Sequence, residues 1–110
     1  MYRKYKVIIL QEAQEDIRNI ILYIASDLGS PLAALHLNEG FYEKIKSLAD
    51  MPKRIRKINK EPWKSKGIRQ LRFKNYFIYF IISDKDNSVK INAVIYTGRD
   101  QKKHIRQNAI

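Results

Sequence analysis

The sequence GIRQLRFKNYFIYFII, residues 67–82, is where the chain changes from a charged segment into a strongly apolar one. Apolar and polar residues alternate from Gln70 to Lys74, which is the two-residue period of a strand with one buried face. Asn75 marks a tight corner, and residues 76–82 after it are almost wholly apolar. An apolar run of this length predicts a central strand that is covered on both faces.

A third strand follows the apolar run. Residues 83–88, SDKDNS, have the composition of a hairpin turn. Residues 89–96 alternate again, and Gly98 ends the pattern before a polar tail that starts at residue 99. The three strands are therefore predicted to form an antiparallel meander.

Two helical patterns precede the meander. Residues 12–28 carry apolar side chains at spacings of three and four, and Gly29 ends this first helix. Ser30–Pro31 predicts a capped start for a second helix over 31–49, which Pro52 prevents from continuing. Because the junction is so short, we expect an antiparallel helical hairpin.

A short strand is predicted at the N-terminus, over residues 4–10. The order of strand, helix, helix and three strands indicates an α+β fold with the hairpin on one face of an antiparallel sheet. We expect the opposite face to be open and to carry functional side chains. Residues 1–110 are expected to form a single domain.

Charge is distributed unevenly along this basic chain, which has a net charge of +11. Residues 53–74 hold ten basic residues and one acidic residue, whereas residues 11–52 have an acidic excess of four. Such an asymmetry favours RNA, DNA or an acidic protein segment as partner. Residues 53–66 are predicted to be a loop, with room for a short strand around 55–58. Trp63 is expected to dock onto the fold, since a large apolar side chain is out of place among lysines.

The composition also bears on compartment and cofactors. The chain has no cysteine, so disulfides and thiolate metal sites are excluded, and a reducing compartment is favoured. No apolar run approaches the ~20 residues of a membrane span or the core of a signal peptide. We therefore expect a cytoplasmic protein without a metal or another cofactor.

Four blocks of the sequence carry a family resemblance when taken together and in order. They are Ala13-x-x-Asp16-Ile17-x-x-Ile20-x-x-Tyr23-Ile24, then Ser30-Pro31-x-Ala33-Ala34, then Ile45-x-x-Leu48-x-x-Met51-Pro52, and a last block that runs from Gly67-Ile68-Arg69-x-Leu71 through Tyr76-x-Ile78-Tyr79 to Val94-x-Tyr96-x-x-Arg99-Asp100. This combination resembles the RelE/ParE toxin superfamily over nearly the whole chain.

The resemblance implies the toxin of a type II toxin–antitoxin system, which arrests growth and is neutralised by a cognate antitoxin. A hetero-oligomer with that antitoxin is expected. RelE-like members cut messenger RNA on the ribosome without a metal ion, whereas ParE-like members poison DNA gyrase. The resemblance alone leaves open whether this chain is an enzyme.

The residues that RelE-like enzymes use are largely replaced in this chain. Their arginine on the strand after the corner corresponds to Phe77, and their lysines on the preceding strand correspond to Ile68 and Gln70. The arginine after the last strand is kept as Arg99, while the C-terminal tyrosine corresponds to Ile105. The leading hypothesis is therefore a ParE-like or divergent toxin that acts by binding its target.

Two alternatives stay open. A ribosome-dependent endoribonuclease would draw its catalytic residues from Arg69, Arg72, Arg99 and His104. A non-toxic nucleic-acid-binding module would rest on the basic residues and aromatics alone. Target or nucleic-acid contacts are expected from Lys64, Lys66, Arg69, Arg72, Lys74, Tyr79 and Tyr96, with solvated charges and simple packing as the plainer readings.

Overall fold

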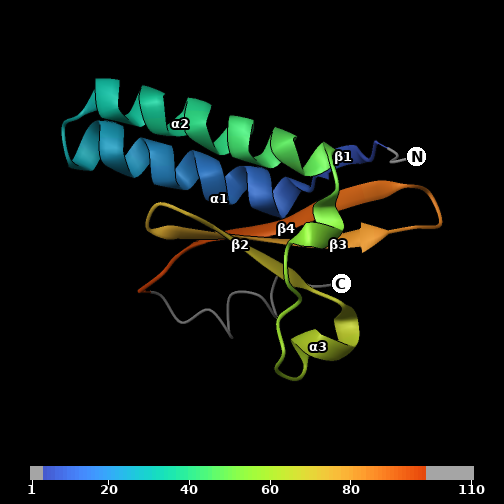
Figure 1. Cartoon of the computed structure of the whole chain (residues 1–110). Coiled ribbons are helices and arrows are strands. Elements are labelled where there is room, and N and C mark those ends of the chain that lie inside the picture. The colour runs from blue at the N-terminus through green and yellow to red at the C-terminus, as the bar shows by residue number, and fades with distance from the viewer. Residues whose placement is uncertain (1–3, 99–110) are drawn as a thin grey trace.

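The elements of the chain follow the order that the sequence predicts (Figure 1). The computed structural model describes residues 4–98. Its elements are β1 (Lys6–Ile9), α1 (Gln11–Leu22), the π-helical turn η1 (Tyr23–Asp27), α2 (Pro31–Lys46), the 3-10 turns η2 (Ser47–Ala49) and η3 (Pro52–Arg54), the short helix α3 (Trp63–Lys66), β2 (Arg69–Phe73), β3 (Tyr76–Ser83) and β4 (Ser88–Tyr96).

One four-stranded sheet has the order β1-β4-β3-β2. The antiparallel meander of β2, β3 and β4 is confirmed. The expectation of a wholly antiparallel sheet is wrong, because β1 pairs with β4 in parallel, from Lys6 opposite Ser88 to Ile9 opposite Ile91. The hairpin and the meander separate these two strands in the sequence, and a long connection of this kind permits parallel pairing.

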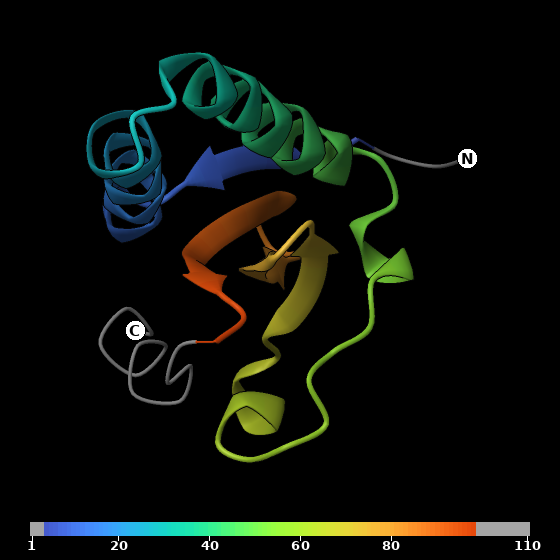
Figure 2. The ribbon, with the colours of Figure 1, turned by 90° about the vertical axis from the view of Figure 1, so that its left-hand side faces the viewer.

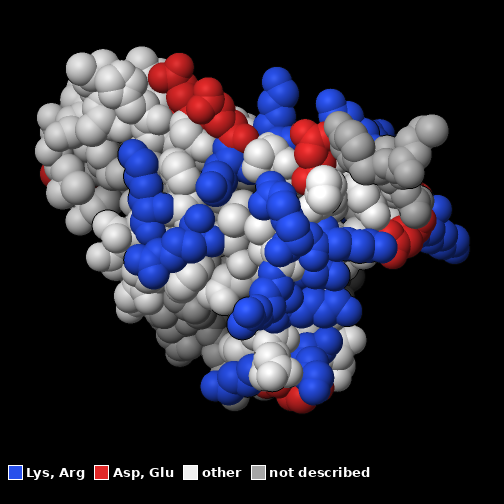
Figure 3. Space-filling view, in the orientation of Figure 1, with Lys and Arg blue, Asp and Glu red and all other residues white. Residues whose placement is uncertain are grey.

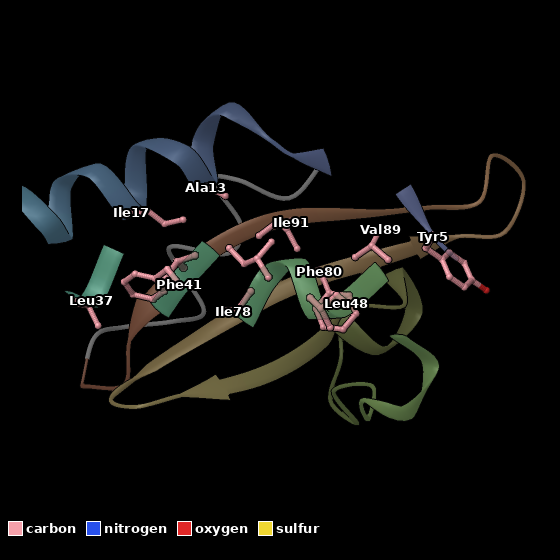
Figure 4. Close-up of a cluster of buried hydrophobic side chains, with 12 residues drawn as sticks. Tyr5, Ala13, Ile17, Leu37, Phe41, Leu48, Ile78, Phe80, Val89 and Ile91 are labelled. Atoms are coloured by element: carbon pink, nitrogen blue, oxygen red, sulfur yellow. The ribbon is translucent and has the colours of Figure 1, made fainter. Parts of the chain in front are cut away.

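The helical hairpin covers one face of the sheet, as predicted (Figure 2). Ile17 of α1 and Phe41 of α2 are buried against Ile78, Phe80 and other apolar side chains of the strands (Figure 4). The backbone of α2 also approaches β2 closely at Gly40, where an added Cβ atom would lie 2.6 Å from the ring of Phe73. Glycine at this position therefore lets the helix lie flat on the sheet.

The second face of the sheet is covered in part, which corrects the prediction of an open face. Trp63, Ile68 and Tyr79 form a second buried cluster there, together with Ala93 and Ile95 of β4. The short helix α3 lies on this side of the sheet, opposite the helical hairpin (Figure 2), and Trp63 and Ile58 are the side chains from this part of the chain that pack on the strands. The predicted docking of Trp63 is confirmed, with 8% of the residue exposed.

The helix boundaries confirm most of the predicted signals. Gly29 adopts a left-handed conformation with φ +63° between the two helices, and Pro31 is the first residue of α2. The predicted capping by Ser30 is wrong, because its Oγ donates to the carbonyl of Leu28 at 3.5 Å instead. The strand expected around 55–58 is also wrong, since it is reduced to one bridge between Lys57 and Arg69.

Asp16 has a role that the sequence analysis missed. Its carboxylate Oδ2 accepts a hydrogen bond of 3.0 Å from the backbone N–H of Val94, which is buried in β4. The pairing of β1 with β4 ends at Ile91, so this part of β4 has no strand on that side. A buried N–H needs a partner, and the first turns of α1 supply one. This contact explains the structural role of the aspartate in the Ala13-x-x-Asp16-Ile17 block.

Asp16→Ala is expected to lower the free energy of unfolding by about 1–3 kcal/mol, because it leaves the Val94 N–H buried without an acceptor. Asp16→Asn keeps an acceptor oxygen and should lose much less. Urea unfolding followed by circular dichroism measures both variants, with Glu15→Ala as the control at an exposed neighbour. Equal stability of the alanine and asparagine variants would contradict the assignment.

Candidate functional site

Positive charge gathers on one side of the molecule, over the chain between η3 and α3. We call residues 54–66 the basic segment. Its six basic side chains are all exposed, namely Arg54, Arg56, Lys57, Lys60, Lys64 and Lys66. Figure 3 shows Lys and Arg atoms massed over this part of the fold, while Asp and Glu atoms follow the helical hairpin above it.

The basic segment is held against the sheet by apolar burial and by backbone hydrogen bonds. Trp63 is buried in the second cluster, and Ile58 packs against the same cluster. The backbone N–H of Ile58 donates to the carbonyl of Ile68 at 2.9 Å. Glu61, the one acidic residue of the segment, accepts from the backbone N–H and the Oγ of Ser65 and so closes the turn of α3. The cations are therefore displayed on an ordered backbone.

Arg69 joins the start of this segment to the sheet. Its Nη1 donates to the carbonyl of Ile55 at 2.7 Å and to that of Lys53 at 3.4 Å. The neighbouring Lys53 is fixed in turn by Asp84, whose Oδ1 lies 3.1 Å from its Nζ and also accepts from the hydroxyl of Tyr5 at 3.0 Å. Asp84 raises the pKa of Lys53 through this hydrogen bond and the opposite charge. Arg69 thus holds the chain at Lys53 and Ile55 in place through hydrogen bonds to their backbone carbonyls.

Arg69 and Arg72 lie on opposite faces of the sheet. Arg69 is opposite Phe80, which belongs to the cluster under the hairpin. Arg72 is opposite Phe77, which packs against the second cluster, and its guanidinium lies 5.5 Å from the centre of the Phe77 ring. Residues three apart in a strand point to opposite sides. The described chain therefore does not bring these two candidate catalytic arginines together.

The positions that correspond to the RelE lysines and arginine are packed and carry no charged side chain. Ile68 is fully buried, Phe77 is half-buried in the same cluster, and Gln70 donates to the hydroxyl of Tyr79 at 3.1 Å. Burial raises the pKa of Tyr79 to about 12, so its hydroxyl stays protonated at neutral pH. With 1% of the residue exposed, Tyr79 packs in the core and has no free ring face for a base.

The remaining predicted contact residues fall into two groups at opposite ends of β2. Lys64 and Lys66 are exposed on α3, before the strand begins. Arg72 and Lys74 are exposed at the β2–β3 turn, where the Arg72 Nε donates to the Lys74 carbonyl. Tyr96, 53% exposed, packs edge-on against Tyr76. Arg99, His104 and Ile105 lie outside the described residues.

A second surface of different character lies at the closed end of the helical hairpin. Most of the large apolar side chains that the described chain exposes are here, namely Leu22, Tyr23, Leu28, Leu32 and Leu35. A hollow of about 630 Å³ lies between α1 and α2, and its lining includes Arg18, Leu22 and Tyr42. Exposed apolar patches of this kind are typical of protein-binding surfaces.

Residues 4–98 contain no helix with the length and apolar character that crossing a membrane requires. In the same range, no three His, Cys, Asp or Glu side chains lie close enough together to hold a metal ion.

The family comparison agrees with the fold and with the arrangement of the blocks. The sequence model described as the ParE toxin of the type II toxin–antitoxin system parDE matches residues 7–101. The chain belongs to this ParE toxin family. It is therefore the toxin component of a type II toxin–antitoxin system. A search of the curated proteins finds no match.

Solved structures of other proteins have the same fold as this ParE-family toxin. A chain of the chromosomal ParDE system from P. aeruginosa superposes with a TM-score of 0.69 at 18% identity, covering 84% of this chain and 96% of that one. A chain of the RelBE2 toxin–antitoxin complex from Mycobacterium tuberculosis gives 0.57 at 18% identity, with 86% and 92% covered. A mutant of the E. coli toxin RelE in the free state gives 0.62 at 14% identity, with 96% and 94% covered.

Arg69→Ala is expected to loosen the basic segment of the ParE-family toxin, because two backbone carbonyls lose their donor. Limited trypsin digestion should cut within residues 54–66 about fivefold faster or more, since cleavage reports local opening. Arg72→Ala is the matched control, as it removes the same charge from the other face of the same strand. If both variants are cut at the rate of the unaltered chain, Arg69 does not position the segment.

Proposed function

We propose that this ParE-family toxin arrests growth by binding DNA gyrase, and that it does not cut RNA. The observation that carries the proposal is the apolar packing of Ile68 and Phe77 under the segment that leads to α3. Cutting RNA requires groups that neutralise the phosphate and move protons at the attacking and leaving oxygens. An isoleucine and a phenylalanine provide neither function at these positions.

The positions of the other candidates support the same proposal. The Nη1 of Arg69 donates to the carbonyls of Lys53 and Ile55, at the start of the basic segment, and Arg72 lies on the opposite face of the sheet. Tyr79 is buried and has a pKa of about 12, which is far from the range useful for proton transfer at neutral pH. A binding mechanism needs none of these groups to converge on one phosphate.

One observation favours the RelE-like alternative, a ribosome-dependent messenger RNA endoribonuclease. The Arg72 guanidinium lies over the Phe77 ring at 5.5 Å, so a cation stands beside the position where RelE-like enzymes carry their arginine. Arg99 and His104 of the C-terminal segment would then have to complete the site. The experiments below separate this alternative from gyrase binding.

An antitoxin is the second partner that we infer. The structural neighbours from P. aeruginosa and M. tuberculosis are a toxin–antitoxin system and a toxin–antitoxin complex. In this toxin, the exposed leucines at the closed end of the hairpin offer the apolar area that a stable protein complex buries. A hetero-oligomer that covers this surface is the arrangement we propose.

Brief induction of the chain in a bacterial host tests the target directly. We expect labelling of new DNA to fall first while protein labelling continues, because a gyrase poison stops replication before translation. An early collapse of protein labelling would instead support the ribosomal nuclease. If neither label changes, the chain is an inert protein or a non-toxic binding module.

Arg99→Ala and His104→Ala should leave growth arrest intact, since binding does not depend on these groups as catalysts. The measurement is colony formation after induction, with the amount of toxin compared by immunoblot. Phe77→Ala is compared with these two variants at the same amount of toxin. It removes packing from the second face of the sheet and leaves every charged group in place. If Arg99→Ala and His104→Ala lose toxicity while Phe77→Ala keeps it, the result would support a catalytic mechanism.

A further inference from the structure

We propose that the basic segment, residues 54–66, binds the phosphate backbone of duplex DNA. The choice of DNA over duplex RNA rests on the proposed function, since gyrase acts on duplex DNA. The proposal therefore assigns this toxin a direct contact with the nucleic acid that its target protein holds. It goes beyond a contact between two proteins.

The cations of the basic segment are available to a polyanion. The six exposed basic side chains of the segment have no ion pair with a described carboxylate, and the one acidic residue among them, Glu61, is engaged by Ser65. Lys53, just outside the segment, does have an ion pair, with Asp84. Cations that form no ion pair with a described carboxylate attract a polyanion and release the counterions of that polyanion on binding.

The chain around these cations offers few apolar anchors. No large apolar side chain between residues 52 and 95 is exposed. Protein-binding surfaces draw most of their affinity from buried aromatic and aliphatic anchors, and this toxin exposes such groups at the hairpin instead. An acidic peptide bound to the basic segment would make charge–charge contacts but few apolar contacts. A phosphate backbone needs only charge and hydrogen-bond donors.

The basic segment suits a duplex better than a single strand. Proteins that bind unpaired nucleic acid stack its bases on exposed aromatic rings. The aromatic residue of the segment, Trp63, is buried against Tyr79 and Ile95 in the second cluster. Because burial of Trp63 and the Arg69 contacts already order the backbone, the lysines can meet a regular row of phosphates at a low entropic cost.

The test is binding of the purified full-length chain to a fluorescent duplex of random sequence, measured by anisotropy over a series of salt concentrations. The triple variant Lys60→Ala, Lys64→Ala, Lys66→Ala should weaken binding more than about tenfold at 0.1 M salt and reduce the salt slope by about 2 to 3. Replacing the same three lysines by arginine should retain binding. Circular dichroism confirms that each variant is folded.

The control removes the same charge elsewhere. Arg18, Lys44 and Lys85 are exposed cations of α1, α2 and the β3–β4 turn. Their triple alanine variant should bind the duplex within about threefold of the unaltered chain. Equal weakening by both triple variants would mean that net charge alone attracts the DNA, and the proposed site would be wrong.

Three competing probes complete the design. An unlabelled single strand or a poly-glutamate peptide of matched charge should compete less well than an unlabelled duplex. Better competition by the single strand or by the peptide would overturn the assignment to duplex DNA. The third competitor, a duplex RNA of the same length, is expected to compete about as well, because the contacts are to phosphates.

Inhibition of gyrase supercoiling separates this proposal from the proposed function. If the lysine variant loses duplex binding and still inhibits gyrase like the unaltered chain, the role of DNA contact in toxicity is wrong while gyrase targeting stands. If the unaltered chain binds the duplex at the basic segment and leaves gyrase unaffected, the site stands and gyrase targeting fails. We expect the lysine variant to lose both activities together.

Discussion

The strands β3 and β4 are apolar on both faces, and the rest of the chain has to supply a cover for each. Ile78 and Phe80 face the helical hairpin, whereas Tyr79 and Ile95 face the segment that leads to α3. The hairpin is an ordinary apolar cover. The other cover is the most basic part of the chain, and Trp63 and Ile58 are what attach it to the sheet. Hydrophobic burial on one side of this segment thus orders the cations on its other side.

Much of the fold could be predicted because the periods are clear. Alternation in β2 and β4, the apolar run of β3 and the spacing of α1 and α2 all place their elements correctly. The packing partners of these elements could not be predicted in the same way. The periodicity of a strand or helix shows which face is buried, but it does not show which segment packs against that face. The parallel pairing of β1 with β4 and the second cover were therefore missed. Trp63 among lysines was the one signal for that cover, and it predicted docking correctly.

The candidate site could be predicted less well, for reasons that the geometry explains. Charge counting found the basic segment, but it could not show that Arg69 donates to backbone carbonyls while Arg72 lies across the sheet. Strand parity would have separated these two arginines, because they are three residues apart. In the sequence, Asp16 is one residue of the Ala13-x-x-Asp16-Ile17 block, with nothing to indicate its partner. Its contact with the Val94 N–H depends on where β1 ends, which the sequence does not reveal.

Binding to gyrase is the activity that we propose for this ParE-family toxin. It can be measured by mixing the purified chain with gyrase, ATP and supercoiled plasmid, denaturing the protein and quantifying linear DNA. Programmed ribosomes with labelled messenger RNA are treated with the same preparation in parallel. The account predicts that linear DNA accumulates with the toxin while the messenger RNA stays intact. Cut messenger RNA with no rise in linear DNA would contradict it.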